Sequence, residues 1–168
     1  MHERTEGFRI RRQLAGLTNA DVGRLLHINP NRASELLTDT GAFKDLHELR
    51  CELRSALNRG PDLRRVHAEL SQGELVPGRA GRDARWARTI LDQTLRQWSA
   101  EAGHSIYWWS IFERDELAAS HALERESLAT HESEWVGWRM KEAAEKLAAL
   151  FPYATAPLVG AAEGGSDG

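Results

Sequence analysis

Five polar side chains between residues 31 and 38 carry the hydrogen-bonding groups that read the edges of nucleotide bases. An asparagine can pair bidentately with adenine, an arginine with guanine, and a glutamate can accept from cytosine N4, while serine and threonine can contact a base or the backbone. If this stretch is helical, Ala33, Leu36 and Leu37 share the inward face. The outward face then holds Asn31, Arg32, Ser34, Glu35 and Thr38.

A second group of residues suits contacts to phosphate. Asn19 and Asn29 stand near predicted helix starts, where backbone N–H groups favour anions. Basic side chains before and after them could add charge, although one arginine in the preceding helix could instead form an internal ion pair. The expected phosphate contacts are Asn19, Asn29, Lys44, Arg11 and Arg12.

Two short helices must position these groups. Apolar spacing predicts a first helix from Asn19 to Leu26 with Thr18 as its N-cap. Gly23 leaves room for a second helix to approach closely. Asn29 is a strong N-cap for that second helix, and the next residue is a proline, which is harmless at the first helical position. This is a helix-turn-helix pattern with a polar face on its second helix.

The segment LTNADVGRLLHINPNRASELL resembles the second and third helices of lambda-repressor/Cro-like (XRE-type) DNA-binding domains. FRIRRQLAGLT is similar to their first helix, with Phe8, Ile10 or Arg11, and Leu14 inward. TDTGAFKDLHELRCELRSAL is similar to their loop, fourth helix and fifth helix. The resemblance covers residues 6–58 and implies that positions 31, 32 and 35 reach base edges. Where the family usually has glycine at the turn this chain has His27, and histidine is among the residues that tolerate a positive φ.

Composition is ordinary for a globular protein, with 41% hydrophobic and 28% charged residues in 168. The net charge is −3, but residues 1–112 carry +3 and residues 113–168 carry −6. Such an asymmetry fits a DNA-facing half and a half that is solvated or contacts protein. No stretch approaches 18 apolar residues, so we expect a cytoplasmic, nucleoid-associated protein without a membrane partner. The single cysteine, Cys51, is expected to be a buried thiol.

Residues 59–82 are predicted to hold a short helix, with Leu63, Val66 and Leu70 on one face, and then a Gly- and Pro-rich linker at 73–82. A long helix is expected from Asp83 to Gly103. The segment 105–112 suits a buried strand or a helix capped by Ser105 and running on into 113–120; we favour helix, because no partner strand exists. Gly137 and residues 130–134 are expected to divide 113–150 into two helices, and 153–168 should be a disordered tail.

All six tryptophans lie in this second half. They could form the core of a small helical domain, or contribute to a subunit interface, where tryptophan is enriched. Stacking on single-stranded bases would require interleaved basic residues, which the acidic end of the chain lacks. The residues predicted to take part in oligomerisation are Trp98, Trp108, Trp109, Trp135 and Trp138.

The sequence therefore predicts an all-α protein with a five-helix, repressor-like domain at 1–58, a connection at 59–82 and a Trp-rich helical domain at 83–152. We expect it to bind double-stranded DNA as a homodimer and to act as a transcriptional repressor of phage or mobile-element type. Alternatives are a factor for phage packaging or partition, and an antitoxin-like protein with a protein partner. No catalytic or nucleotide-binding motif occurs, and the seven histidines lack zinc-ligand spacing, so no enzyme activity, metal or cofactor is expected.

Overall fold

The computed structural model describes residues 2–27, 29, 31, 57 and 59–157. These residues form helices and connections without a strand, which confirms the all-α prediction. The chain divides into two compact units between Asp62 and Leu63, here called the N-terminal and C-terminal units. Across the described residues, no helix is long and apolar enough to cross a membrane.

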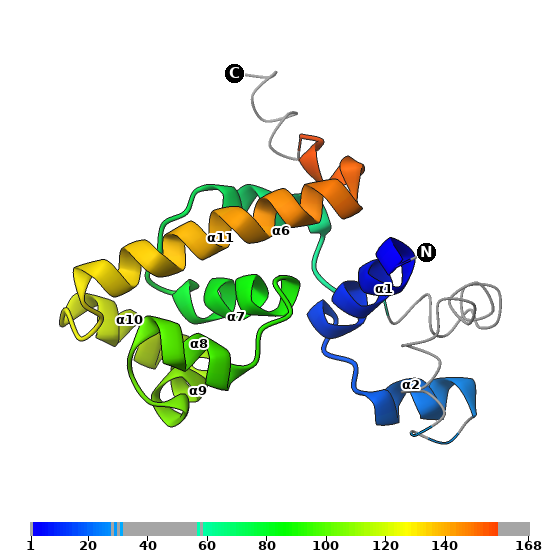
Figure 1. Ribbon diagram of the computed structural model, residues 1–168, viewed down its shortest axis with the longest axis horizontal. Helices are drawn as coiled ribbons and strands as arrows, with labels where there is room; N and C mark the ends of the chain where they lie inside the picture. Colours follow the sequence, from blue (N-terminus) through cyan, green and yellow to red (C-terminus); the bar gives the residue numbers. More distant parts are fainter. Residues whose placement is uncertain (1, 28, 30, 32–56, 58, 158–168) are drawn as a thin grey trace. The chain divides into compact units, whose positions relative to one another are not determined.

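The N-terminal unit contains α1 (His2–Leu14) and α2 (Asn19–Leu26) (Figure 1). Its buried apolar side chains come from both helices and from one later residue: Phe8, Ile10, Leu14, Val22 and Leu57. Ile10 is fully buried whereas Arg11 is half-exposed, so isoleucine is the inward residue of the two predicted alternatives. The predicted later helices of this domain, and Cys51, lie in 32–56, outside the described residues.

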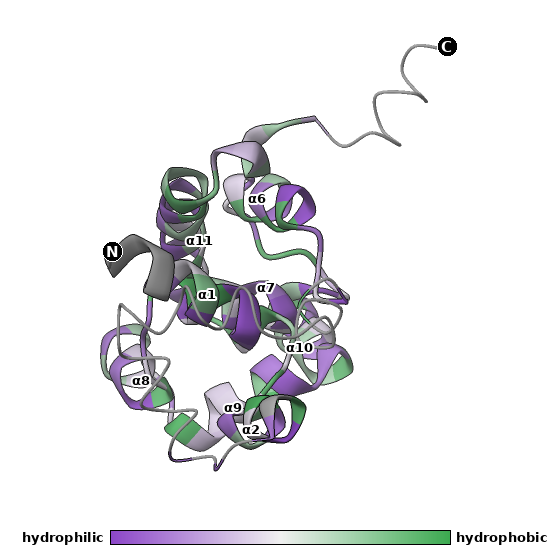
Figure 2. Ribbon diagram, turned by 90° about the vertical axis from the view of Figure 1, so that its right-hand side faces the viewer, coloured by the Kyte–Doolittle hydropathy of each residue, from purple (hydrophilic) through white to green (hydrophobic). Residues whose placement is uncertain are grey.

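The C-terminal unit is a bundle around one long helix, α11 (Thr130–Leu150) (Figure 1). This helix packs against α6 and α7, and α9 packs against α7, α8 and α10. Figure 2 shows polar and apolar residues on different sides of these helices, the pattern that lets a helix bury one face. The other elements are α6 (Leu63–Ser71), α7 (Ala80–Ile90), α8 (Leu95–Ala102), α9 (Ile106–Arg114), α10 (Glu116–Glu124) and the 3₁₀ turn η1 (Pro152–Thr155).

The boundary between the units differs from the predicted connection at 59–82. α6 has the predicted buried face of Leu63, Val66 and Leu70, and it packs on α11. The segment 73–79 therefore connects two helices of one unit and does not separate two domains. The predicted disorder is wrong for the start of the segment 153–168, because η1 packs on α6 and α11 with Ala154 buried. Residues 158–168 lie outside the described residues.

The predicted long helix from Asp83 to Gly103 is two helices, and the physical reason is local. Thr94 forms a capping box with Gln97, and this starts α8 as a new helix. The residue before the cap region, Asp92, has a φ of 56°. Helix periodicity alone does not reveal this break, because the apolar spacing continues across it.

The segment 105–112 forms the start and most of the helix α9, and a helix is what the sequence favours. The side chain of Ser105 caps it and accepts the N–H of Trp108 at 3.0 Å. The helix does not run on into residues 115–120, because Asp115 caps α10 through the N–H groups of Leu117 and Ala118.

Two glycines in the C-terminal unit allow backbones to touch. A Cβ at Gly81 of α7 would lie 2.0 Å from the carbonyl oxygen of Phe112 in α9. A Cβ at Gly137 of α11 would lie 2.2 Å from the carbonyl oxygen of Gly73, just after α6. Gly137 therefore marks a close crossing inside one continuous helix. After α9, the region 113–150 does hold two helices, as predicted, but the break between them is at 125–129 and not at 130–134 or Gly137.

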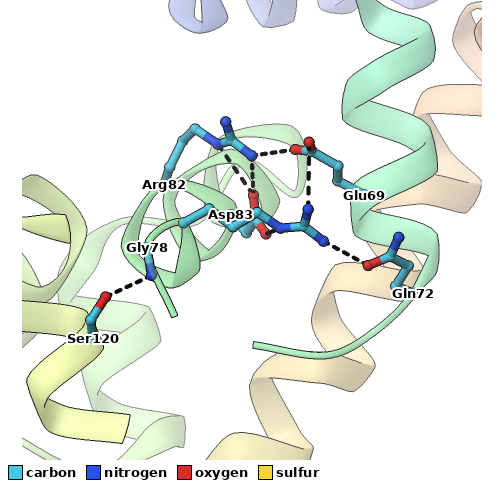
Figure 3. A network of polar contacts seen from close by, with 7 residues as sticks. Glu69, Gln72, Gly78, Arg82, Asp83 and Ser120 are labelled. Atoms are coloured by element: carbon cyan, nitrogen blue, oxygen red, sulfur yellow. Dashed lines mark hydrogen bonds and ion pairs between the residues drawn. The ribbon is translucent and has the colours of Figure 1, made fainter. Parts of the chain in front are cut away.

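A buried ion network holds α6 against α7 (Figure 3). The Asp83 side chain is fully enclosed, and its two oxygens accept from Arg79 and Arg82 at 3.1 Å each. Both arginines also pair with Glu69 of α6, and Arg79 donates to Gln72. Burial raises the pKa of Asp83 above its ordinary value, an effect that the hydrogen bond and charge of Arg82 oppose.

Replacing Gly81 by alanine is expected to lower the free energy of unfolding by about 1–3 kcal/mol, because the added methyl must displace the Phe112 carbonyl. Helix propensity alone would act in the opposite direction, stabilising by about 1 kcal/mol. Denaturant unfolding of the full chain measures the sign. Arg85→Ala, at an exposed position of the same helix, is the control. A Gly81→Ala variant more stable than wild type would contradict the close crossing.

Asp83 should make the C-terminal unit less stable as pH rises. A raised folded-state pKa means that the folded chain binds the proton more tightly than the unfolded chain. The stabilisation is complete below the unfolded pKa of about 4 and is lost as pH rises through the folded value. Denaturant unfolding of wild type and of Asp83→Asn can be followed by tryptophan fluorescence between pH 3 and 7. The free energy of unfolding of wild type minus that of the variant should decline as pH rises. A difference that stays level or increases would show that Asp83 has no raised pKa.

Candidate nucleic-acid interface

α2 starts at the N-cap that the sequence predicts, and this cap is part of a capping box. The Thr18 hydroxyl accepts the N–H of Asp21 at 3.1 Å, and the Asp21 carboxylate accepts the N–H of Thr18 at 2.8 Å. Hydrogen bonds that the Thr18 N–H and hydroxyl donate to this carboxylate lower the pKa of Asp21 below its ordinary value. Asp21 also pairs with Arg24, whose side chain is 77% exposed. The predicted bounds of this helix, Asn19 to Leu26, and its predicted N-cap are confirmed.

The turn after α2 takes a left-handed residue. His27 has φ 58° and ψ 43°, and its N–H donates back to the carbonyls of Gly23 and Arg24. Two residues later, the Asn29 side chain accepts the backbone N–H of Asn31 at 2.8 Å, as an N-cap does for the second residue of a helix. Three residues, 27–29, thus connect the end of α2 to a capped helix start.

The structure places five of the predicted DNA-contacting residues in this unit. Asn29 and Asn31 are exposed and lie together at the capped start. Asn19 is half-buried at the start of α2, and its Oδ1 has no hydrogen-bond partner within the described part of the chain. Arg11 and Arg12 are half-exposed on α1. The others lie outside the described residues: Arg32, Ser34, Glu35, Thr38 and Lys44.

Arg12 has an internal partner. Its Nη1 donates to the carbonyl oxygen of Leu17 at 2.6 Å, and this contact connects α1 to the turn before α2. Burial lowers the pKa of Arg12, and the nearby charge of Arg9 lowers it further. A hydrogen bond of this kind positions α2 relative to α1. The internal ion pair predicted for one arginine of this helix is found at Arg9, which pairs with Glu6 at 3.7 Å, whereas Arg12 binds a backbone carbonyl.

The predicted oligomerisation residues divide by burial. Trp98 and Trp109 are fully buried and pack edge-to-face with ring centroids 6.2 Å apart, so they belong to the core of the C-terminal unit. Trp135 packs on Trp98 and is half-buried. Trp108 is also half-buried, and its ring stacks on His104. Trp138 is 55% exposed and is the accessible member of the set.

An apolar groove of about 200 Å³ lies between α9 and α10. Tyr107 of α9 is 72% exposed and Leu117 of α10 is 65% exposed. The groove is lined by Ser105, Tyr107, Trp108, Ile111, Phe112, Ala118 and Ala122.

In the described residues, no three histidine, cysteine, aspartate or glutamate side chains come together as a metal site would require.

No protein-family model matches the chain, and neither a curated protein nor a solved structure shows a significant match.

Substitutions at His27 should separate the need for a left-handed residue from any need for the imidazole. His27→Val is expected to destabilise the N-terminal unit by about 1–2 kcal/mol, because a β-branched residue resists positive φ. His27→Gly, the matched variant, should keep or increase stability. Hydrogen exchange of the α2 amides measures both. Equal protection in the two variants would contradict the left-handed turn.

Proposed function

We propose that this protein is a sequence-specific regulator that binds double-stranded DNA through a helix-turn-helix in its N-terminal unit. The observation that supports this best is the left-handed His27 after α2, followed two residues later by the Asn29 side chain that accepts the N–H of Asn31. A helix-turn-helix offers the N-terminal residues of its second helix to base edges in the major groove. Asn31 is the first predicted reading residue of that helix, and it is exposed.

The side chains that follow Asn31 supply the chemistry of recognition. Arg32 suits guanine and Glu35 suits cytosine, and Ser34 and Thr38 add hydrogen bonds to bases or backbone. Phosphate contacts position such a helix without specifying sequence. Asn29 at the helix start and the exposed Arg24 of α2 are candidates for these contacts, together with Asn19, Arg11 and Lys44.

Repression is the simplest regulatory outcome, because a protein bound at a promoter blocks RNA polymerase without any further contact. A homodimer would place two reading helices one helical turn apart, about 34–36 Å, on a roughly palindromic site. Trp138, exposed on α11, is the tryptophan best placed to contribute to such a dimer. A compact regulator of this kind suits a phage or mobile element, acting in the cytoplasm where the DNA is.

Arg32→Ala tests the reading helix. In vitro selection from random duplexes with the full chain should first yield an enriched site. On that site, the variant should bind about 5- to 150-fold more weakly and lose preference at one base position, since a bidentate pair contributes about 1–3 kcal/mol. Arg65→Ala removes an exposed arginine from α6, outside the proposed DNA-binding segments, and should leave affinity unchanged.

Two results would contradict the proposal. Selection that enriches no sequence would exclude sequence-specific binding by this chain. Equal weakening of Arg32→Ala on all duplexes would assign Arg32 to phosphate and not to a base. Circular dichroism of both variants confirms that the helices are intact. Native mass spectrometry of the complex distinguishes a dimer from the ring expected of a packaging or partition factor.

A further inference from the structure

The hydrogen bonds that precede and start α2 occur a second time in the chain, at α8. α2 begins at Asn19 and α8 begins at Leu95, so equivalent positions are 76 residues apart. Both helices have eight residues, and they end at Leu26 and Ala102 with the same spacing. The correspondences below all keep this spacing, without an insertion or a deletion.

In both units, an arginine of the helix before the capped helix binds a backbone carbonyl at an equivalent position. Arg12 Nη1 donates to the Leu17 oxygen at 2.6 Å, and Arg88 Nη1 donates to the Gln93 oxygen at 2.9 Å. The backbone returns the interaction in each case, because the N–H of Leu17 donates to the carbonyl of Arg12 and that of Gln93 to the carbonyl of Arg88. The guanidinium thus fixes the turn between α1 and α2 and the turn between α7 and α8 in the same way.

The same capping box starts the second helix in both units. The Thr18 hydroxyl accepts the N–H of Asp21, and the Thr94 hydroxyl accepts the N–H of Gln97, each at 3.1 Å. The Asp21 and Gln97 side chains both accept the N–H of the capping threonine. The two helices therefore begin with the same pair of reciprocal hydrogen bonds.

Two further pairs of equivalent residues share a property, one pair before the capping threonine and one after it. Gly16 and Asp92 both have a positive φ, 76° and 56°, in the turn before the helix. Val22 and Trp98, on the first turn of the two helices, are both fully buried. The turn and the inward face are thus shared although the side chains differ greatly in size.

The residue after the helix has a positive φ in both units, 58° at His27 and 86° at Gly103, although ψ differs, 43° against 179°. Two residues later, the side chains of Asn29 and Ser105 both accept a backbone N–H, that of Asn31 and that of Trp108. α9 therefore follows α8 in the chain as the reading helix of the proposed function follows α2.

The exposed side of α9 differs in chemistry from its counterpart. Tyr107 is 72% exposed and Ile106 is 40% exposed at the helix start, where a reading helix contacts bases. Apolar and aromatic groups of this kind contact the methyl group of thymine in the major groove. Arg96 on the first turn of α8 and Arg114 at the end of α9 are exposed cations that fit phosphate. The positions equivalent to 31, 32, 34, 35 and 38 are Tyr107, Trp108, Ser110, Ile111 and Arg114.

We propose that residues 80–114 form a second helix-turn-helix, and that α9 contacts a second, thymine-containing stretch of duplex DNA. This inference rests on the proposed function, since it extends to the C-terminal unit the role assigned to the N-terminal unit. Because the two reading helices carry different side chains, they select different base sequences. Each protomer then recognises two unlike blocks of sequence and not one.

Tyr107→Ala tests this inference on the site that the full chain selects. The variant should bind about 10-fold more weakly and lose sequence preference in one block, while Arg32→Ala loses it in the other. Tyr153→Ala is the matched control, because Tyr153 is 55% exposed on η1, outside both helix-turn-helix segments. Tyr107 is mostly solvated, so thermal unfolding of the two variants should be alike.

Replacing thymine by deoxyuracil in the second block tests the contact itself. The methyl group is removed and every Watson–Crick hydrogen bond is kept. Wild type should bind the substituted duplex as weakly as Tyr107→Ala binds the natural one, and Tyr107→Ala should not distinguish the two duplexes.

The outcomes separate this inference from the proposed function. If Arg32→Ala loses specificity but Tyr107→Ala and the deoxyuracil duplex behave as wild type, α9 does not contact DNA and the inference is overturned while the proposed function stands. If Tyr107→Ala binds DNA normally and loses self-association in sedimentation, α9 and its groove form a protein interface, which also overturns the inference. If selection enriches no site, the proposed function fails and the inference fails with it.

Discussion

The position of α9 depends on one buried ion pair. Arg88 of α7 donates to both carboxylate oxygens of Glu113 at 2.8 Å, and it also donates to the carbonyl of Gln93 before α8. Glu113 is 4% exposed at its side chain, so neither charge could remain there without the other. A single guanidinium thus joins α7, the turn before α8 and the end of α9. Because breaking such a pair by removing one partner costs about 3–5 kcal/mol, these three elements are expected to move as one body.

At a few positions of the C-terminal unit, the size of the side chain determines how closely the helices pack. At Gly81 and Gly137 the backbone of another segment lies where a side chain would start, so only glycine fits. The space between the helices is filled by large rings, with Trp98 and Trp109 fully buried. An aromatic core with such close crossings has little freedom to rearrange, since protein interiors are packed as densely as organic crystals. This rigidity suits a unit whose proposed task is to present one helix face in a fixed orientation.

The two units share local backbone features but differ in side chains. Each has a threonine-capped helix of eight residues, followed by a residue with positive φ and, two residues later, a side chain that accepts a backbone N–H. The residues predicted to read bases in the N-terminal unit are polar and suit hydrogen bonds, whereas α9 exposes a tyrosine and an isoleucine. The proposed specificity therefore comes from side chains on a repeated scaffold, as functional sites commonly vary on one fold.

Local chemistry made much of this predictable. Thr18 and Ser105 are caps because their hydroxyls satisfy N–H groups a few residues away, and His27 follows α2 because it tolerates a left-handed backbone. The chain also signalled the break before α8 through Thr94 and Gln97, but an apolar period that continued across it concealed the signal. Other features depend on residues far apart in sequence. The sequence could not show that Gly137 lies against Gly73, that α6 belongs to the C-terminal unit, or which arginines are held by carbonyls, because each follows from contacts made only when the helices pack. Caps and turns were thus determined by neighbours along the chain, while burial and partnership were decided by tertiary structure, since both depend on what lies across the core.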